Sequence, residues 1–150
     1  YQNTLPFLAP EDQPPLVDGE AINSRALYKH MFVPGRDDIA FMGFVRPTFG
    51  TIPGLAEMQA RVYAAVLEEE IPLPDASTMA PVIAADAERE LGRFWASTCH
   101  SSLTDFAQYL EDLAEWRGVR PSYEALWRED KGLFARSLLC QVSAHRYWLP

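Results

Sequence analysis

The sequence predicts an α+β fold that is predominantly helical, with short strands in its first third and helices in the remainder. Three observations lead to this prediction. Seven of the twelve prolines precede Leu55, which is typical of extended and irregular connections. Residues 26–32 and 39–45 are short apolar runs of strand length. After residue 54, apolar residues recur every three or four positions, as they do on one face of a helix.

The two predicted strands lie close together in the sequence. Residues 26–32 (ALYKHMF) alternate loosely between apolar and polar side chains, and residues 39–45 (IAFMGFV) are apolar apart from Gly43. Both patterns are typical of strands, and the second suits a strand that is covered on both faces. The turn at residues 35–38 would join them as a hairpin or as neighbouring strands. Because a two-stranded ribbon is marginal in water, we expect both strands to join a larger sheet.

A predicted loop and an amphipathic helix follow the second strand. The loop is marked by Arg46, Pro47, Gly50 and Pro53. The helix then runs over residues 54–70, with an apolar stripe formed by Leu55, Met58, Val62 and Val66. Such a junction aims backbone N–H groups beyond the carboxyl end of the strand, where they favour anionic or polarised ligand groups.

The next predicted helix begins after a Pro-rich break. Asp75 is a plausible N-cap, and Pro81 either belongs to the first turn or kinks the helix. Its apolar residues repeat at four-residue spacing and would form one stripe. That stripe consists of Met79, Ile83, Ala87, Leu91 and Trp95.

Three more helical patterns complete the sequence. The serines at positions 101–102, with Asp105 three residues on, resemble a capping box for a helix that stops at Gly118. The apolar face of this helix is formed by Leu103, Phe106, Leu110 and Leu113. Ser122 caps a short helix, and a turn at residues 130–132 leads into the last one.

The composition is that of an acidic globular domain. A length of 150 residues suits one domain with its own core, and contents of 48% hydrophobic and 23% charged residues are ordinary. A net charge of −8 argues against binding to nucleic acid or to an anionic membrane surface. No apolar run approaches the ~20 residues that span a bilayer, and there is no signal peptide, so we expect no membrane span and a cytoplasmic location. Because the chain begins at Tyr1 without a methionine, we expect a piece of a longer protein.

Several motifs that carry chemistry are absent from the sequence. It contains no Gly-x-Gly-x-x-Gly, and the glycines at positions 50 and 54 lack the Lys-Ser/Thr of a phosphate loop. None of the histidines (His30, His100 and His145) has a partner at metal-ligand spacing, so we predict no metal site. Cys99 and His100 are sequence neighbours, which rarely aim their side chains at each other, and we predict no catalytic residue.

Two further sets of side chains have competing interpretations. Five aromatic residues lie mostly at helical stripe positions, and we favour a place in the core over a stacking platform. They are Trp95, Trp116, Trp127, Trp148 and Phe134. Gln59 lies off the apolar stripe of its helix. It is either a surface or cap-supporting polar residue, or it reaches back toward the preceding loop and a ligand there.

The stretch GFVRPTFGTIPGLAEMQAR, residues 43–61, resembles the C-terminal part of a flavin-containing monooxygenase. In that family a strand ends in Gly, and Gln-Pro or Arg-Pro, a Gly-x-Ile loop, a Pro and a helical Glu-x-Gln-Ala-Arg follow. The matching residues here are Gly43, Arg46-Pro47, Gly50-Thr51-Ile52, Pro53 and residues 57–61. Arg46 stands where the animal enzymes commonly have Gln, and Phe49 resembles an insertion. Similar patterns at residues 1–8, 27–32, 73–79 and 105–121 extend the resemblance over nearly all of the chain.

This resemblance implies a fold and a mechanism. Residues 1–53 would supply strands and connections that complete a doubly wound FAD-binding domain, and residues 54–150 would form a helical C-terminal region that caps it. The whole enzyme would use FAD and NADPH to form a hydroperoxyflavin, which oxygenates a soft nitrogen or sulfur nucleophile. The glycine-rich fingerprints for both cofactors lie upstream in the family. We therefore expect this chain alone to be inactive and to bind neither cofactor tightly.

The resemblance also implies cofactor contacts and partners. The residues expected near the flavin ring or its ribityl chain are Arg46, Pro47, Gly50, Thr51 and Gln59. The expected partner is an N-terminal FAD/NADP-binding half, on the same chain or on a separate one. Two alternatives remain open: a stand-alone helical interaction module, and one chain of a split flavoprotein. Because the isolated chain would expose an apolar face, we also expect it to self-associate as a homo-oligomer.

Overall fold

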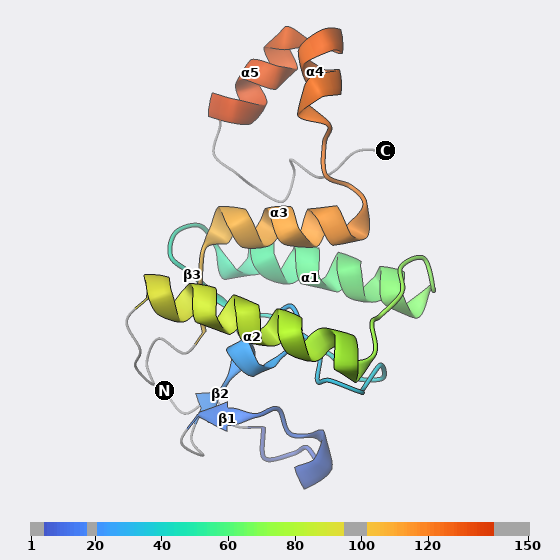
Figure 1. Cartoon of the computed structure of the whole chain (residues 1–150), viewed down its shortest axis with the longest axis vertical. Helices are drawn as coiled ribbons and strands as arrows, with labels where there is room; N and C mark the ends of the chain where they lie inside the picture. The colour runs from blue at the N-terminus through green and yellow to red at the C-terminus, as the bar shows by residue number, and fades with distance from the viewer. Residues whose placement is uncertain (1–4, 18–20, 95–101, 140–150) are drawn as a thin grey trace.

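The computed structural model describes residues 5–17, 21–94 and 102–139 (Figure 1). Its α-helices are α1 (Ile52–Leu67), α2 (Ala76–Arg93), α3 (Phe106–Arg117), α4 (Tyr123–Glu129) and α5 (Lys131–Leu139). The described residues also form two 3-10 helices, η1 (Pro10–Asp12) and η2 (Ser24–Ala26). Their strands have two residues each: β1 (Leu16–Val17), β2 (Ala21–Ile22), β3 (Arg46–Pro47) and β4 (Leu103–Thr104). The described chain is therefore predominantly helical, as the sequence predicts.

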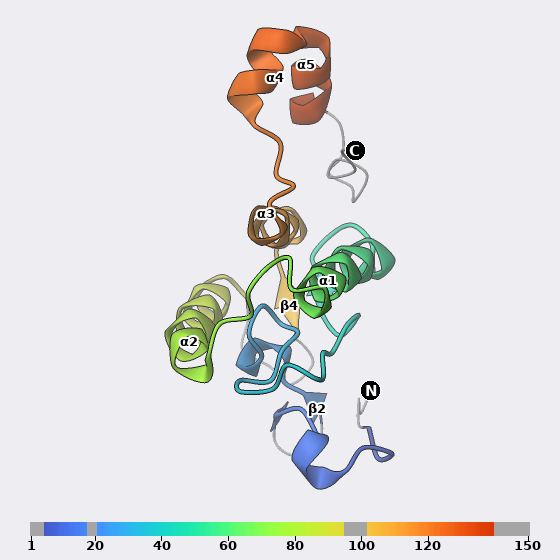
Figure 2. The ribbon, with the colours of Figure 1, turned by 90° about the vertical axis from the view of Figure 1, so that its right-hand side faces the viewer.

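The three longest helices pack around a shared core. Viewed close to end-on, α1, α2 and α3 stand at the corners of a triangle, and α1 and α3 lie side by side in the first view (Figures 1 and 2). The core residues with almost no exposed surface include Met31, Phe32, Val45, Leu55, Met58, Val62, Leu110 and Leu113. This core draws on residues before and after position 53. The division of the chain at that position stays a prediction about the whole protein.

The structure confirms the first predicted helix, with small shifts at both ends. α1 covers residues 52–67, whereas the sequence predicts residues 54–70. In its apolar stripe Leu55, Met58 and Val62 are fully buried, and Val66 packs against the core. Burial of each side chain of this size stabilises the folded state by about 1.5–3 kcal/mol relative to leaving it exposed. Burial of this stripe therefore fixes which face of α1 meets the core.

The predicted helix ends are mostly confirmed. Side-chain oxygens of Asp75 and Ser122 accept N–H groups three residues on, at 2.8 and 3.2 Å. Gly118 ends α3 with a φ of 76°, a left-handed conformation that glycine adopts without steric cost. The start of α3 differs from the prediction, since Asp105 is itself the N-cap and accepts the N–H of Gln108 at 3.0 Å. One serine of the predicted capping box lies outside the described residues.

The strand predicted over residues 26–32 is wrong. η2 occupies its first residue, and Lys29 and His30 follow with φ values of 49° and 55°. These left-handed conformations turn the chain instead of extending it. The apolar residues of the segment still reach the core from the turn, because Met31 and Phe32 are fully buried. The same apolar pattern therefore fits a turn as well as a strand.

The strand predicted over residues 39–45 is also wrong. Gly43 has a φ of 79°, and its N–H donates to the side chain of Gln59 at 2.9 Å instead of to a neighbouring strand. The predicted pairing of the two segments is reduced to one antiparallel bridge, between Phe32 and Ala40. A strand needs a hydrogen-bonding partner along its length, and the described residues provide none for this segment beyond that bridge.

The apolar stripe predicted for α2 is wrong at its far end. Met79 is fully buried, but Leu91 is half exposed, and Trp95 lies outside the described residues. Residues four apart advance about 400° around a helix, so a strict four-residue repeat drifts by about 40° at each step. The buried position near the end of α2 is the charged residue Glu90. Pro81 lies inside α2 beyond its first turn, so the first-turn alternative is excluded and the kink stays a prediction.

α4 and α5 form a helix pair that projects away from the other helices (Figures 1 and 2). Neither helix has a buried residue, and Trp127 meets Phe134 edge-on at 5.1 Å between ring centroids. The prediction that Trp127 and Phe134 lie in the core is therefore wrong. Trp116 does pack against the core, edge-on to Tyr28, and the other two tryptophans lie outside the described residues. Among the described helices, none has the length and apolar content needed to cross a membrane.

Candidate functional site

Residues 46–51 comprise β3 and the turn that leads into α1, and they are called the loop below. They contain four of the five predicted site residues. β3 pairs in parallel with β4, so that the Arg46 N–H donates to the Ser102 carbonyl at 2.8 Å and the Thr48 N–H donates to the Thr104 carbonyl at 3.1 Å. Sequence reasoning missed this pairing, because the two strands lie more than fifty residues apart in the chain. β4 therefore fixes the backbone of the loop, while most of its side chains remain exposed.

The glycine of this loop is held against an aromatic ring. Gly50 has a φ of 88°, and a Cβ atom at this position would lie 2.8 Å from the ring of Phe106. Phe106 is the first residue of α3 and is buried. Its ring also contacts Phe49, with 5.6 Å between the two centroids. Both the backbone conformation and the close approach require glycine at position 50.

The start of α1 uses most of its own N–H groups. Thr51 is the N-cap, and its hydroxyl oxygen accepts the Gly54 N–H at 3.3 Å. The Leu55 N–H donates to the Thr51 carbonyl at 3.4 Å, and Pro53 has no N–H to offer. The Ile52 N–H is the donor of this first turn that the cap does not use. The helix start therefore presents fewer donors to a ligand than its sequence suggests.

The five predicted contact residues separate into two groups. Arg46, Pro47, Gly50 and Thr51 lie in the loop and at the helix cap, whereas Gln59 is fully buried two turns into α1. The interpretation of Gln59 as a surface residue is wrong. Its side-chain oxygen accepts the N–H of Gly43, just before the loop, so it supports the segment that leads there. Cofactor contacts for all five residues stay predictions.

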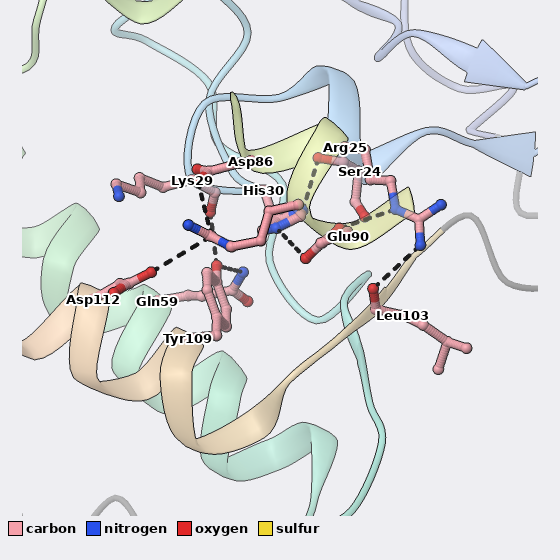
Figure 3. A network of polar contacts seen from close by, with 11 residues as sticks. Ser24, Arg25, Lys29, His30, Gln59, Asp86, Glu90, Leu103, Tyr109 and Asp112 are labelled. Carbon is pink, nitrogen blue, oxygen red and sulfur yellow. Dashed lines mark hydrogen bonds and ion pairs between the residues drawn. The ribbon is translucent and has the colours of Figure 1, made fainter. Parts of the chain in front are cut away.

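A buried network of polar groups joins η2 and the turn at His30 to α2 (Figure 3). At its centre the Glu90 carboxylate lies 2.9 Å from Arg25 Nε and 3.1 Å from His30 Nε2, and all three side chains are buried. Burial alone would raise the pKa of Glu90. The hydrogen bonds and charge of His30, with hydrogen bonds from Thr104 and Arg25, outweigh burial and leave the pKa below its ordinary value of 4.5. Glu90 is thus held as a buried carboxylate between basic groups.

His30 has the residue type of a general base but not the geometry. Its Nε2 faces Glu90, and its Nδ1 lies 3.1 Å from the carbonyl oxygen of Ser24. Both ring nitrogens are therefore engaged by the protein, and neither is left to meet a substrate. The left-handed backbone at Lys29 and His30 places the ring in this position. We interpret His30 as a structural residue that joins η2 to α2.

Tyr109 and Gln59 continue the network toward the loop (Figure 3). Gln59 Nε2 donates to the Tyr109 hydroxyl at 2.8 Å, and that hydroxyl donates to the Lys29 carbonyl at 2.7 Å. Burial raises the pKa of Tyr109, against the lowering effect of the Gln59 hydrogen bond, so the phenol keeps the proton that it donates. A continuous hydrogen-bonded path thus joins Gly43, α1, α3 and the turn at Lys29.

Sequence reasoning did not identify Arg25, His30, Glu90 or Tyr109 as parts of one cluster. One signal was present, because Glu90 lies on the face of α2 that also carries Met79 and Asp86. A carboxylate on the buried face of a helix needs a paired charge. The sequence could therefore indicate that a partner exists, but it could not say which of the many basic residues is the partner.

A cavity of about 90 Å³ opens beside the network, between α2, α3 and the turn at Lys29. It is large enough for about three water molecules. Charged side chains in its lining pair with each other, with Arg89 2.8 Å from Asp86 and Arg93 2.6 Å from Asp105. Among the described residues, no group of three or more His, Cys, Asp or Glu side chains could hold a metal ion. We therefore assign the cavity to the structural network.

The Tyr109 hydroxyl is expected to contribute measurably to stability. Tyr109→Phe would leave the buried Gln59 Nε2 and the part-buried Lys29 carbonyl without their partner, and should lower the free energy of unfolding by about 1–3 kcal/mol. Urea unfolding measures the change. Tyr63→Phe is the matched control, because its hydroxyl makes an exposed 3.5 Å contact and its loss should change stability by less than about 0.5 kcal/mol. Equal effects of the two substitutions would contradict the role of the network.

Comparison with known families gives one match over the whole chain. The sequence model of the family described as flavin-binding monooxygenase-like matches residues 1–150. This match covers the loop, both helices that contact it and the buried network.

Individual relatives carry names from two kinds of enzyme. The chain is 34% identical to a 4-hydroxybenzoate brominase (decarboxylating) of Pseudoalteromonas luteoviolacea over 86% of this chain and 24% of that protein. It is 31% identical to flavin-containing monooxygenase 5 of Oryctolagus cuniculus and 29% identical to flavin-containing monooxygenase 2 of Homo sapiens. Both of these matches cover 99% of this chain and 27% of the relative. The chain thus spans about a quarter of the length of the curated relatives it matches.

Proposed function

The chain belongs to the flavin-binding monooxygenase-like family, and from this we propose that it forms the C-terminal part of an FAD- and NADPH-dependent monooxygenase. The observation that carries the proposal is the family match over residues 1–150. The proposed reaction is oxygenation of a soft nitrogen or sulfur nucleophile through a hydroperoxyflavin. Relatives named flavin-containing monooxygenase and dimethylaniline monooxygenase (N-oxide-forming) support this reaction type.

The loop residues have side chains that suit a flavin. Arg46, Thr48 and Thr51 are exposed and can donate hydrogen bonds to carbonyl and hydroxyl oxygens, which the ring and ribityl chain of a flavin carry. Phe49 and Ile52 add exposed apolar surface beside them. Ligand sites commonly combine apolar surface with a few polar groups in this way. A bound flavin would supply the oxygen chemistry, and the chain would hold and orient it.

The buried network would keep this loop in place during turnover. Gln59 binds the backbone just before the loop, and β4 holds its first residues. Such support is what a binding loop needs when its own side chains face a ligand. The dinucleotide fingerprints are absent from this sequence, so we propose that an N-terminal half supplies them, on the same or a separate chain.

Bromination of a phenolic acid is the second candidate function. It is favoured by identities of 34% and 33% to two proteins named 4-hydroxybenzoate brominase (decarboxylating). The two candidates separate in one assay of the cofactor-loaded, full-length protein. Oxygenation predicts NADPH consumption coupled to N-oxide or S-oxide formation from a tertiary amine or a thioether. Bromination predicts bromide-dependent conversion of 4-hydroxybenzoate. A colourless protein that shows neither activity would favour the helical interaction module.

Arg46→Ala is expected to weaken flavin retention by the full-length protein. Loss of a hydrogen bond from a charged group costs about 1.5–3 kcal/mol, which corresponds to at least a tenfold weaker dissociation constant. The measurement is FAD occupancy from the absorbance between about 300 and 550 nm after gel filtration. Arg128→Ala, on the projecting helix α4, is the control and should keep its flavin. Unchanged occupancy in Arg46→Ala would refute the contact.

A further inference from the structure

Phe49 is an exposed aromatic residue that the structure nevertheless holds in place. Its side chain is 51% exposed, and Ile52, three residues on, is 41% exposed.

The position of the Phe49 ring depends on its contact with Phe106. The two rings meet at 57° with 5.6 Å between centroids, and Phe106 is buried at the start of α3. Phe106 also fills the space that a side chain at Gly50 would occupy. One flank of Phe49 is thus packed on a ring that cannot easily move. A pre-positioned ring loses little conformational freedom when a ligand binds.

Phe49 shares its loop with exposed polar residues. Arg46, Thr48 and Thr51 are exposed polar residues of the same short loop, and the loop backbone is fixed by β4. An exposed ring gains most from a second planar ring, by stacked or edge-on contact in addition to apolar burial. We propose that Phe49 is a binding residue for a planar aromatic ring at this loop. The proposal rests on the function proposed above and deepens it.

Two sources of such a ring have the same chemistry: the isoalloxazine of the flavin, and the ring of an aromatic substrate. The test uses the full-length protein, freed of bound flavin and labelled with 4-fluorophenylalanine, observed by ¹⁹F NMR. The Phe49 signal is identified by its loss in Phe49→Leu. The probes are FMN, which carries the flavin ring, and 4-hydroxybenzoate, each at millimolar concentration. Cyclohexanecarboxylate, a carboxylate with a non-planar ring, is the control ligand.

We expect one aromatic probe to shift the Phe49 signal saturably, with no shift from cyclohexanecarboxylate. Its dissociation constant, measured from the ligand signals, should be about tenfold weaker for Phe49→Leu, which keeps apolar volume but lacks the ring. Phe7→Leu should leave it unchanged, because Phe7 is 78% exposed outside the loop. A shift with FMN identifies a flavin contact, and a shift with 4-hydroxybenzoate alone identifies a substrate contact. Failure of both probes, or equal binding by Phe49→Leu, overturns the proposal.

The flavin content of the full-length protein distinguishes a wrong ring contact from a wrong assignment as a flavoprotein. If the full-length protein contains FAD but neither probe shifts the Phe49 signal, the ring contact is wrong and the flavoprotein assignment stands. If the full-length protein contains no flavin, the proposed function is wrong. A saturable shift by 4-hydroxybenzoate would then still establish Phe49 as an aromatic-ring site.

Discussion

Glu90→Gln is expected to lower the free energy of unfolding by about 3–5 kcal/mol, the typical cost of removing one partner of a buried ion pair. The glutamine side chain has nearly the same shape, so packing changes little. It removes the negative charge that lies 2.9 Å from Arg25 and 3.1 Å from His30, both of which are buried. The remaining basic groups would be left without compensation. Urea unfolding at neutral pH measures the loss.

The matched control is Glu88→Gln, on the exposed face of the same helix. It removes the same charge from the chain, so any effect of net charge is common to both variants. We expect it to change stability by less than about 0.5 kcal/mol. A similar small effect at both positions would show that the Glu90 ion pairs do not hold η2 and α2 together.

The pH dependence of the same comparison gives an independent check. Because the folded protein lowers the pKa of Glu90 below 4.5, its ionised form stabilises the fold. This contribution is complete above pH 4.5 and is lost as the pH falls through the lower pKa of the folded state. The stability difference between the native chain and Glu90→Gln should therefore shrink on acidification below pH 4.5. A difference that grows on acidification would contradict this assignment.

Gly50→Ala has the second largest expected effect, a loss of about 2–5 kcal/mol in the free energy of unfolding. The left-handed backbone at φ 88° costs an alanine about 1–2 kcal/mol. The added Cβ would lie 2.8 Å from the buried ring of Phe106, and overpacking of this kind costs about 1–3 kcal/mol. Relief of the overlap would move either Phe106 or the loop. Thermal or urea unfolding measures the loss.

Gly92→Ala is a control with the opposite expected sign. Gly92 lies in the last turn of α2, and a Cβ there would meet no atom within 4 Å. Alanine is the better helix former, so this change should stabilise the chain by about 0.5 kcal/mol. If Gly50→Ala and Gly92→Ala change the free energy of unfolding equally, the contact between the loop and Phe106 does not contribute to stability.

Local patterns in the sequence were sufficient for the helices. The stripe of α1 and the caps at Asp75, Ser122 and Gly118 depend on residues three or four positions apart, which a helix brings together wherever it lies. The same locality explains the error in α2. A strict four-residue repeat predicted Leu91 at the core. Because such a repeat drifts around the helix, Glu90 occupies the buried position and Leu91 is half exposed.

The candidate site was predictable in part. The glycines, prolines and Arg46 of the loop marked a turn before a helix, and the structure has that turn. The hydrogen-bond partners of Gln59 could not be predicted from the sequence, because Gly43 and Tyr109 lie 16 and 50 residues away. Helical periodicity says which face a residue occupies, but it does not say what another segment places opposite that face.

Local sequence patterns were thus sufficient for the family, the helical character and the ends of most helices. The strands depended on contacts between distant segments, since residues 26–32 and 39–45 can be extended only where a neighbour supplies hydrogen bonds along their length. The same holds for the buried network, which joins Arg25 to Glu90 across 65 residues. Such contacts depend on where distant segments meet, and no short stretch of sequence contains that information.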